Sequence, residues 1–154
     1  MDYLLVKWIH ILSSTVLFGT GIGIAFFLFM AHLSRDVASI AAVARIVVIA
    51  DWLFTTPAVI IQPLSGWWLM TEAGFPITQR WLWISIALYL LAGVCWLPVV
   101  WIQLRLRKMA QTAQQTHQVL PARYWRLAAI WTILGLPAFS ALLMVFYLMI
   151  AKPV

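Results

Sequence analysis

Four apolar stretches, each long enough to cross a lipid bilayer, dominate the sequence and leave little room for a water-soluble fold. They cover residues 3–33, 41–70, 81–104 and 125–150, and a helical bilayer crossing needs about 20 predominantly apolar residues. Composition agrees, because 65% of the residues are hydrophobic and only 9% are charged. A soluble domain of this size could not bury so much apolar surface. The stretches are continuously apolar rather than alternating, which favours helices over a β-barrel.

We therefore expect an all-α fold, a four-helix transmembrane bundle that forms one integral membrane domain over residues 1–154. The distribution of basic residues predicts its orientation. Seven of the ten Lys and Arg residues flank the connections at residues 34–40 and 105–124, and three lie at the opposite level. The positive-inside rule then places both connections in the cytoplasm and both termini on the outer side of a bacterial inner membrane. The seven are Arg35, Arg45, Arg105, Arg107, Lys108, Arg123 and Arg126, and the three are Lys7, Arg80 and Lys152.

A single histidine, His10, interrupts the first apolar stretch in the segment KWIHILSSTVLFGTGIG. Helical spacing places Ser13, Ser14 and Gly21 on the same face as His10. A stripe of small and polar side chains on an apolar helix is expected to face the bundle interior. We interpret these four residues as a candidate cofactor site near the outer surface, with His10 as a ligand of haem iron or another metal. A histidine that is only hydrogen-bonded at a helix end is the plainer alternative, and it stays open.

The partner of His10 on a haem cannot be His32, which lies on the same predicted helix. The two are 22 residues apart, or about 33 Å along a helix. Met70 falls at the outer level and could supply a thioether, although methionine in an apolar helix is far more often a packing residue. Pairing His10 with its copy across a homodimer is the other possibility.

A second stripe of polar residues occurs at helical spacing in the second apolar stretch and is expected to face the first stripe. An ionised carboxylate inside a membrane needs a basic partner, so Asp51 is predicted to form an ion pair with Arg105 or Arg126. A pair that fixes helix packing and a group that relays protons are both compatible with this pattern. The stripe consists of Asp51, Thr55, Gln62 and Ser65.

The longest polar segment, RLRKMAQTAQQTHQVLPAR, could bind anionic lipid headgroups or a protein, although its charge is already explained by topology. The sequence contains no phosphate-binding loop, no H-E-x-x-H, no C-x-x-C and no nucleophile elbow. Nothing beyond net charge supports binding of nucleic acid, so none is expected. These observations leave open whether the protein is an enzyme.

Over almost its full length the chain resembles a bacterial family of four-helix "predicted integral membrane proteins" whose function is unassigned. The resemblance rests on the segments LLVKWIHILSSTVLFGTGIG, ARIVVIADWLFTTPA, CWLPVVWIQLRLR and RYWRLAAIWTILGLPAFSALLMVFYLMIAKP. The opening segment is also similar, more distantly, to HemJ-type protoporphyrinogen oxidases and CopD-type copper-resistance proteins. In the HemJ type an early histidine ligates a b-type haem, so this resemblance implies that role for His10. That type also relies on a lysine in a later helix, and residues 81–104 contain none, so the oxidase activity does not carry over.

The leading functional hypothesis is a multi-pass inner-membrane redox protein that holds haem b through His10. A non-catalytic structural or accessory subunit of a membrane complex is the alternative from a different class. A small transporter or copper-handling protein is a third, although the chain lacks the cluster of methionines or histidines typical of soft-metal sites. The expected partners are the lipid bilayer and either other membrane proteins or a second copy of the chain.

Overall fold

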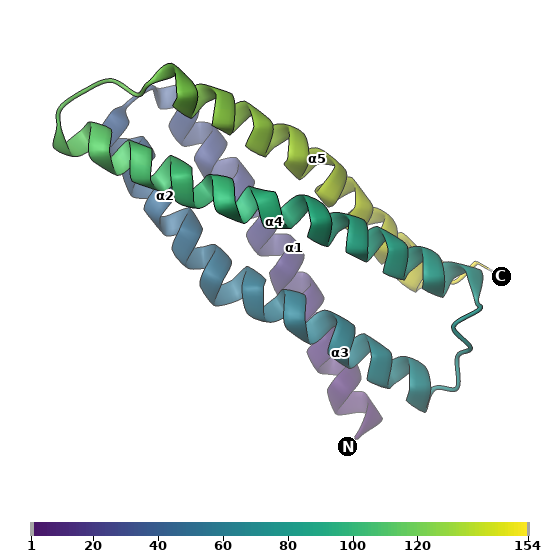
Figure 1. The fold of residues 1–154 in the computed structure, drawn as a ribbon. Helices are drawn as coiled ribbons and strands as arrows, with labels where there is room; N and C mark the ends of the chain where they lie inside the picture. The colour runs from purple at the N-terminus through teal and green to yellow at the C-terminus, as the bar shows by residue number, and fades with distance from the viewer. Residues whose placement is uncertain (1, 154) are drawn as a thin grey trace.

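The computed structural model describes residues 2–153, which form long helices joined by short connections (Figure 1). Helices α2, η1 and α3 follow one another without a break, so the chain passes along the molecule four times. Each of these four units is long and apolar enough to cross a membrane. The helices are α1 (Tyr3–Ser34), α2 (Val37–Ala50), the π-helical η1 (Asp51–Thr55), α3 (Thr56–Glu72), α4 (Arg80–Gln115) and α5 (Ala122–Ala151).

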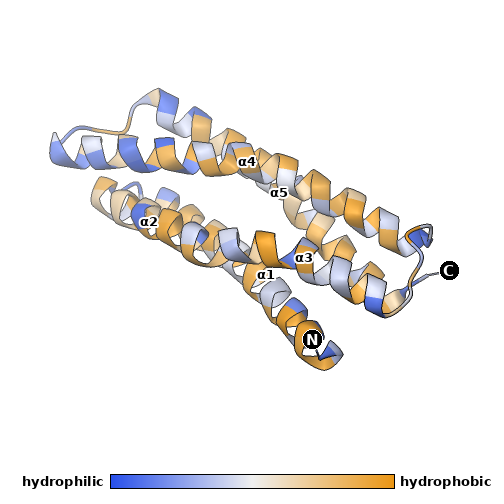
Figure 2. Ribbon diagram, turned by 60° about the horizontal axis from the view of Figure 1, so that its bottom comes forward, coloured by the Kyte–Doolittle hydropathy of each residue, from blue (hydrophilic) through white to orange (hydrophobic). Residues whose placement is uncertain are grey.

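The four units run up and down, so their connections and termini gather at two ends of the molecule (Figure 1). The connections α1–α2 and α4–α5 lie at one end, which we call the basic end. The start of α1, the end of α5 and the α3–α4 connection lie at the other, which we call the terminal end. Hydrophilic residues concentrate toward the two ends, and the helices between them are mostly hydrophobic (Figure 2). This arrangement confirms the predicted all-α fold with four apolar spans.

Residues 34–40 and 105–124 were predicted to be loops, and their secondary structure was predicted wrongly, because both segments are mostly helical. Only Arg35 and Asp36 separate α1 from α2, and α4 continues to Gln115. The Asp36 carboxylate caps α2 by accepting a hydrogen bond from the Ser39 amide at 2.8 Å. The extension of α4 is polar but rich in good helix formers, and its residues Leu106, Ala110 and Ala113 are buried. High polarity was therefore a poor sign of a loop.

The half of the molecule nearest the basic end has a continuous core to which all four units contribute. Ile40, Leu28, Ala110 and Tyr124 are at most 1% exposed there. On α4 the inward-facing residues follow a seven-residue repeat, the spacing that keeps one seam of a helix against its neighbours in a left-handed bundle. The buried residues of one such position are Ser85, Ala92, Val99, Leu106 and Ala113.

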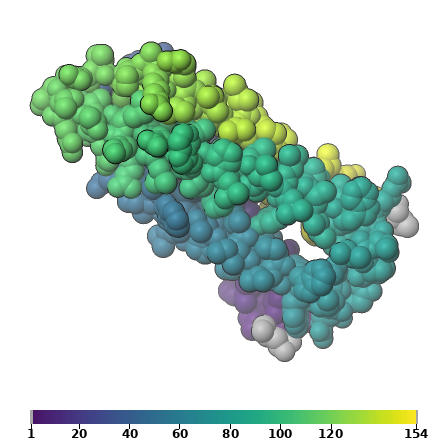
Figure 3. Space-filling view, in the orientation of Figure 1, coloured from purple at the N-terminus to yellow at the C-terminus, as the bar shows by residue number. Residues whose placement is uncertain are grey.

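The half nearest the terminal end is packed differently. There α3 packs mainly against α1, while α4 and α5 pack against each other along their length. The two pairs meet again at the extreme end, where Met70 belongs to a small cluster of buried residues with Trp81, Leu82 and Leu148. Between these contacts the space-filling view shows an opening between α3 and α4 (Figure 3). Isolated links such as the hydrogen bond from the Tyr89 hydroxyl to the Val59 carbonyl (2.7 Å) bridge the two pairs.

Candidate functional site

His10 lies at the centre of a hydrogen-bond network that joins α1 to α3. Its Nδ1 atom is 2.8 Å from Oγ of Ser65. The Gln62 side-chain amide donates to the His10 backbone carbonyl at 2.7 Å and also to the Ser13 hydroxyl. Ser13 itself donates to the same His10 carbonyl at 3.1 Å. The structure thus brings His10 and Ser13 of the first polar stripe together with Gln62 and Ser65 of the second.

The hydrogen bonds of Ser65 define the protonation of the His10 ring. The Ser65 hydroxyl donates to the Ile61 carbonyl at 2.6 Å, so it has no second proton to give to His10. With its proton on the Ile61 carbonyl, the Ser65 hydroxyl would accept from Nδ1–H of His10, and in that tautomer the neutral ring carries its lone pair on Nε2. No hydrogen bond to Nε2 is found among residues 2–153. A histidine held through Nδ1 with a free Nε2 is the arrangement that metal-ligating histidines usually adopt.

Gly66 allows the His10 ring to lie directly against the backbone of α3. A Cβ atom built on Gly66 would be 3.2 Å from Cε1 of His10 and 3.9 Å from its Nδ1. The first distance is tighter than ordinary van der Waals contact, so a side chain at this position would push the ring. Gly66 was not identified from the sequence, although its place directly after Ser65 on a polar stripe was an available signal.

Ser14, Gly21 and Met70, which the sequence placed with His10, are not part of this network. The Ser14 hydroxyl donates to the Ile11 carbonyl of its own helix at 2.7 Å. Gly21 faces open space, because a Cβ atom there would have nothing within 4 Å. Met70 is buried in the cluster at the terminal end. Gly21 is exposed, whereas Leu17 and Ile24, about one turn away on the same helix, are buried.

Asp51 forms a separate buried site in the middle of the bundle. It is 3% exposed and begins the π-helical segment η1. The Trp96 indole donates to Oδ1 at 3.4 Å. With its amide nitrogen turned toward Asp51, Gln103 donates to Oδ2 at 3.2 Å, and its oxygen accepts from the Trp131 indole at 3.3 Å. The partners of this carboxylate are therefore neutral donors from α4, and α5 supports one of them.

The structure does not bring Asp51 together with Arg105 or Arg126, so the predicted ion pair is corrected to this set of neutral donors. Arg105 is exposed, and its guanidinium lies 5.1 Å from the centre of the Trp101 ring. Residues two positions apart on a helix differ in direction by about 200°. Because Gln103 faces the interior, Arg105 faces outward. The same geometry turns Arg126 outward from its buried neighbours Tyr124 and Ala128.

His32 lies near the basic end of α1, at the opposite end from His10, and has its own partner. Its Nε2 is 2.8 Å from the hydroxyl of Tyr124, which is fully buried. The Arg35 guanidinium lies 4.3 Å from the centre of the neighbouring Trp125 ring. Among residues 2–153, no group of three or more His, Cys, Asp or Glu side chains is placed to hold a metal ion. A metal at His10 would therefore depend on other ligands.

Four long apolar helices with polar networks between them define a multi-pass integral membrane protein. Residues 4–153 match the family described as "Predicted integral membrane protein (DUF2269)", and the chain belongs to that family. No curated protein and no solved structure shows a significant match to the chain.

Proposed function

We propose that the chain is a redox protein of the bacterial inner membrane that binds a b-type haem through Nε2 of His10, near the outer face. The observation that carries this proposal is the His10–Ser65 hydrogen bond, since it fixes the ring and leaves Nε2 as the free lone pair. The distant resemblance of the opening segment to HemJ-type proteins supports the same residue. The proposed orientation follows from the concentration of Lys and Arg at the basic end.

The surroundings of His10 fit a large flat ligand. Gly66 lets the ring lie against α3, and Gln62 and Ser13 tie the backbone of this part of α1 to α3. The opening between α3 and α4 lies in the same half of the molecule as the His10 network (Figure 3). A bound haem would supply one-electron transfer. The residues of the chain would orient it and keep Nε2 unprotonated for it.

Within one chain, His10 is the one histidine at this level, because His32 lies at the far end of α1 and His117 lies in the α4–α5 connection. A second residue that holds the haem would then come from the copy of His10 in a homodimer, or from Met70 if its thioether left the buried cluster at the terminal end. The first source predicts a dimer that forms with haem, and the second predicts a haem-binding monomer.

The test is the absorbance of the protein purified in detergent from cells supplied with haem. We expect a reduced-minus-oxidised difference spectrum with the bands of a b-type haem, and we expect His10→Ala to abolish it. His32→Ala is the matched control, because it removes the other histidine of α1 and should leave the spectrum unchanged. Ser65→Ala keeps the ligand but removes its hydrogen bond, so it should keep the bands and shift the reduction potential.

A colourless protein, or bands that survive His10→Ala, would reject haem ligation by His10. A colourless protein that co-purifies in a larger complex after gentle extraction would favour the accessory-subunit alternative. Copper binding that is lost in His10→Ala would favour a copper-handling role instead.

A further inference from the structure

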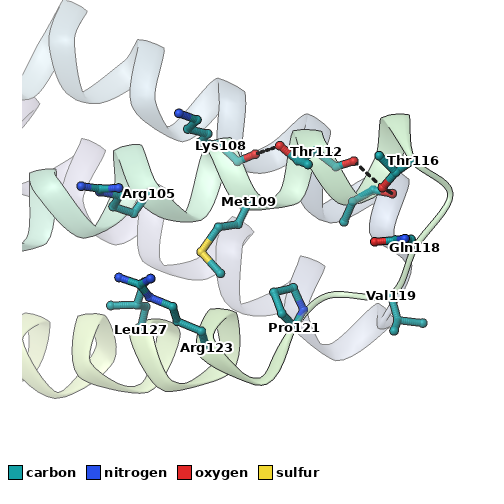
Figure 4. Close-up of a pocket in the computed structure, with 11 residues that line it drawn as sticks. Arg105, Lys108, Met109, Thr112, Thr116, Gln118, Val119, Pro121, Arg123 and Leu127 are labelled. Carbon is teal, nitrogen blue, oxygen red and sulfur yellow. Dashed lines mark hydrogen bonds between the residues drawn. The ribbon is translucent and has the colours of Figure 1, made fainter.

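A hollow of about 360 Å³ opens at the basic end between α4, α5 and the segment that connects them (Figure 4). Three basic residues line it, Arg105 and Lys108 from α4 and Arg123 from α5. In Figure 4, Arg105 and Arg123 extend from the two helices toward the same side of the hollow, and Met109 lies between the helices. None of the described residues that line the hollow is acidic, so its positive charge is not neutralised locally.

The start of α5 adds to this positive character. Pro121 and Arg123 both line the hollow, so the first turn of α5 opens onto it. Pro121 precedes the helix without a capping side-chain hydrogen bond. The first amide groups of a long helix have no partners within the helix and attract anions together with the helix dipole. The Tyr124 amide already donates to the Pro121 carbonyl at 2.8 Å, so the positive end of the helix acts at the hollow mainly through its dipole.

The level of the hollow along the helices matches that of lipid headgroups. The apolar stretch of α4 ends at Leu104, directly before Arg105, and that of α5 begins at Trp125, two residues after Arg123. Trp125 lies in the first turn of α5 and is only partly buried, and tryptophan is typical of membrane interfaces. Met109 and Leu127 give the basic hollow an apolar side. A small soluble phosphate compound has no apolar part that would contact these side chains, whereas the glycerol and acyl chains of a lipid would pack against them.

We propose that this hollow binds the phosphate of an anionic phospholipid headgroup, with Arg105 and Arg123 as the principal contacts. Guanidinium groups bind phosphate oxygens with paired hydrogen bonds, and a free amide at the start of α5 would donate a hydrogen bond to a remaining oxygen. The site would hold a specific lipid against α4 and α5 at the end where these helices extend beyond the apolar core. It is independent of the His10 site, which lies at the other end of the bundle.

Native mass spectrometry of the protein in an uncharged detergent, titrated with phosphatidylglycerol or phosphatidylcholine, measures this binding directly. We expect phosphatidylglycerol to bind in a one-to-one complex and phosphatidylcholine to bind much more weakly. The double variant Arg105→Gln/Arg123→Gln should weaken the phosphatidylglycerol complex by roughly 25-fold, since each basic side chain at an anionic lipid surface contributes about fivefold. Arg123→Gln alone should weaken phosphatidylglycerol binding by a smaller factor. This single variant provides the test if the double variant does not fold.

The matched control is Arg45→Gln/Arg126→Gln, which removes the same charge from exposed residues outside the hollow. We expect this variant to bind phosphatidylglycerol like the unchanged protein. Equal weakening in both double variants would overturn the proposal, because it would assign the effect to net charge. Inorganic phosphate is the third probe. Stabilisation of the protein by phosphate, lost in Arg105→Gln/Arg123→Gln and not matched by the lipid, would also overturn it and assign the hollow to a soluble phosphate compound.

Discussion

The two halves of this bundle are built from the same helices, yet they are held together in different ways. Toward the basic end, side chains from all four units fill one continuous core around Ile40, Leu28 and Tyr124. Toward the terminal end, α1 pairs with α3 through the polar network of His10, Gln62 and Ser65, and an opening separates this pair from α4 (Figure 3). Close packing specifies the first half, whereas directional hydrogen bonds and free space characterise the second.

Truncation of a core leucine should have the largest effect and provides the most direct way to break this comparison. Leu28 is 1% exposed within the continuous core, and Leu17 is 8% exposed on the same helix but outside both core clusters. We expect Leu28→Ala to lower the free energy of unfolding by about 2–5 kcal/mol, and Leu17→Ala to lower it by clearly less. Leu64→Ala, at a residue that is 66% exposed, should change it by less than about 0.5 kcal/mol.

Thermal or denaturant-induced unfolding in one detergent compares the three leucine variants. Equal losses for Leu28→Ala and Leu17→Ala would mean that the two halves are equally well packed, and the comparison would fail.

A methyl group at Gly66 should have the next largest effect, because it meets the His10 ring at 3.2 Å. Gly66→Ala should move the ring and lengthen its hydrogen bond to Ser65, which lowers stability by about 1 kcal/mol. Gly135→Ala is the matched control within a helix, since a Cβ atom there has nothing within 4 Å. That variant should be neutral or stabilising by up to about 1 kcal/mol. Unfolding curves of the two variants and the unchanged protein, measured under the same conditions, test this prediction. A Gly66→Ala protein that is more stable than the unchanged protein would show that the His10 ring is not held against α3 as described.

The smallest expected effect concerns Asp36 at the basic end, and it depends on pH. Hydrogen bonds from Ser39 hold the pKa of Asp36 below its usual value of 3.8. A carboxyl group whose pKa is lowered by folding stabilises the folded state above the usual value, and this contribution is lost as the pH falls through the lowered pKa. The unchanged protein should therefore exceed Asp36→Ala in stability by a constant amount near neutral pH. As the pH is lowered from 3.8 through the lowered pKa, the unfolding midpoints of the two proteins should converge. A difference in midpoint that persists at the lowest pH would show that the charged cap is not the cause of the difference in stability.

Sequence alone predicted much of the fold, because a continuous apolar stretch of sufficient length directly indicates a membrane-spanning helix and its approximate length. It failed for residues 105–115, since polarity was taken to indicate a loop although Leu106 and Ala110 form a buried face. It also failed for the partners of Asp51. A buried carboxylate was expected to pair with an arginine. Its partners are Gln103 and Trp96 instead, because these side chains point from their helix toward Asp51.

The candidate site was predictable in part. His10 and Ser13 follow from helical spacing on one helix, which is a local property. Gly66 and the pairing of His10 with Ser65 depend on how α1 and α3 cross, and no spacing within either helix encodes that crossing. Gly21 was placed on the correct helix, but only the packing shows that it faces open space.

The sequence by itself determined that this is an integral membrane protein, that it has four stretches long and apolar enough to cross a membrane, and that basic residues gather at one end. These properties follow from apolar length and from charge, which are summed along the chain and need no knowledge of neighbours. Only the tertiary structure decided that His10 is fixed by Ser65 with its Nε2 free, that Asp51 is held by neutral donors, and that Arg105 and Arg123 meet at one hollow. Each of these depends on the direction of side chains from different helices, and that direction is set when the helices pack.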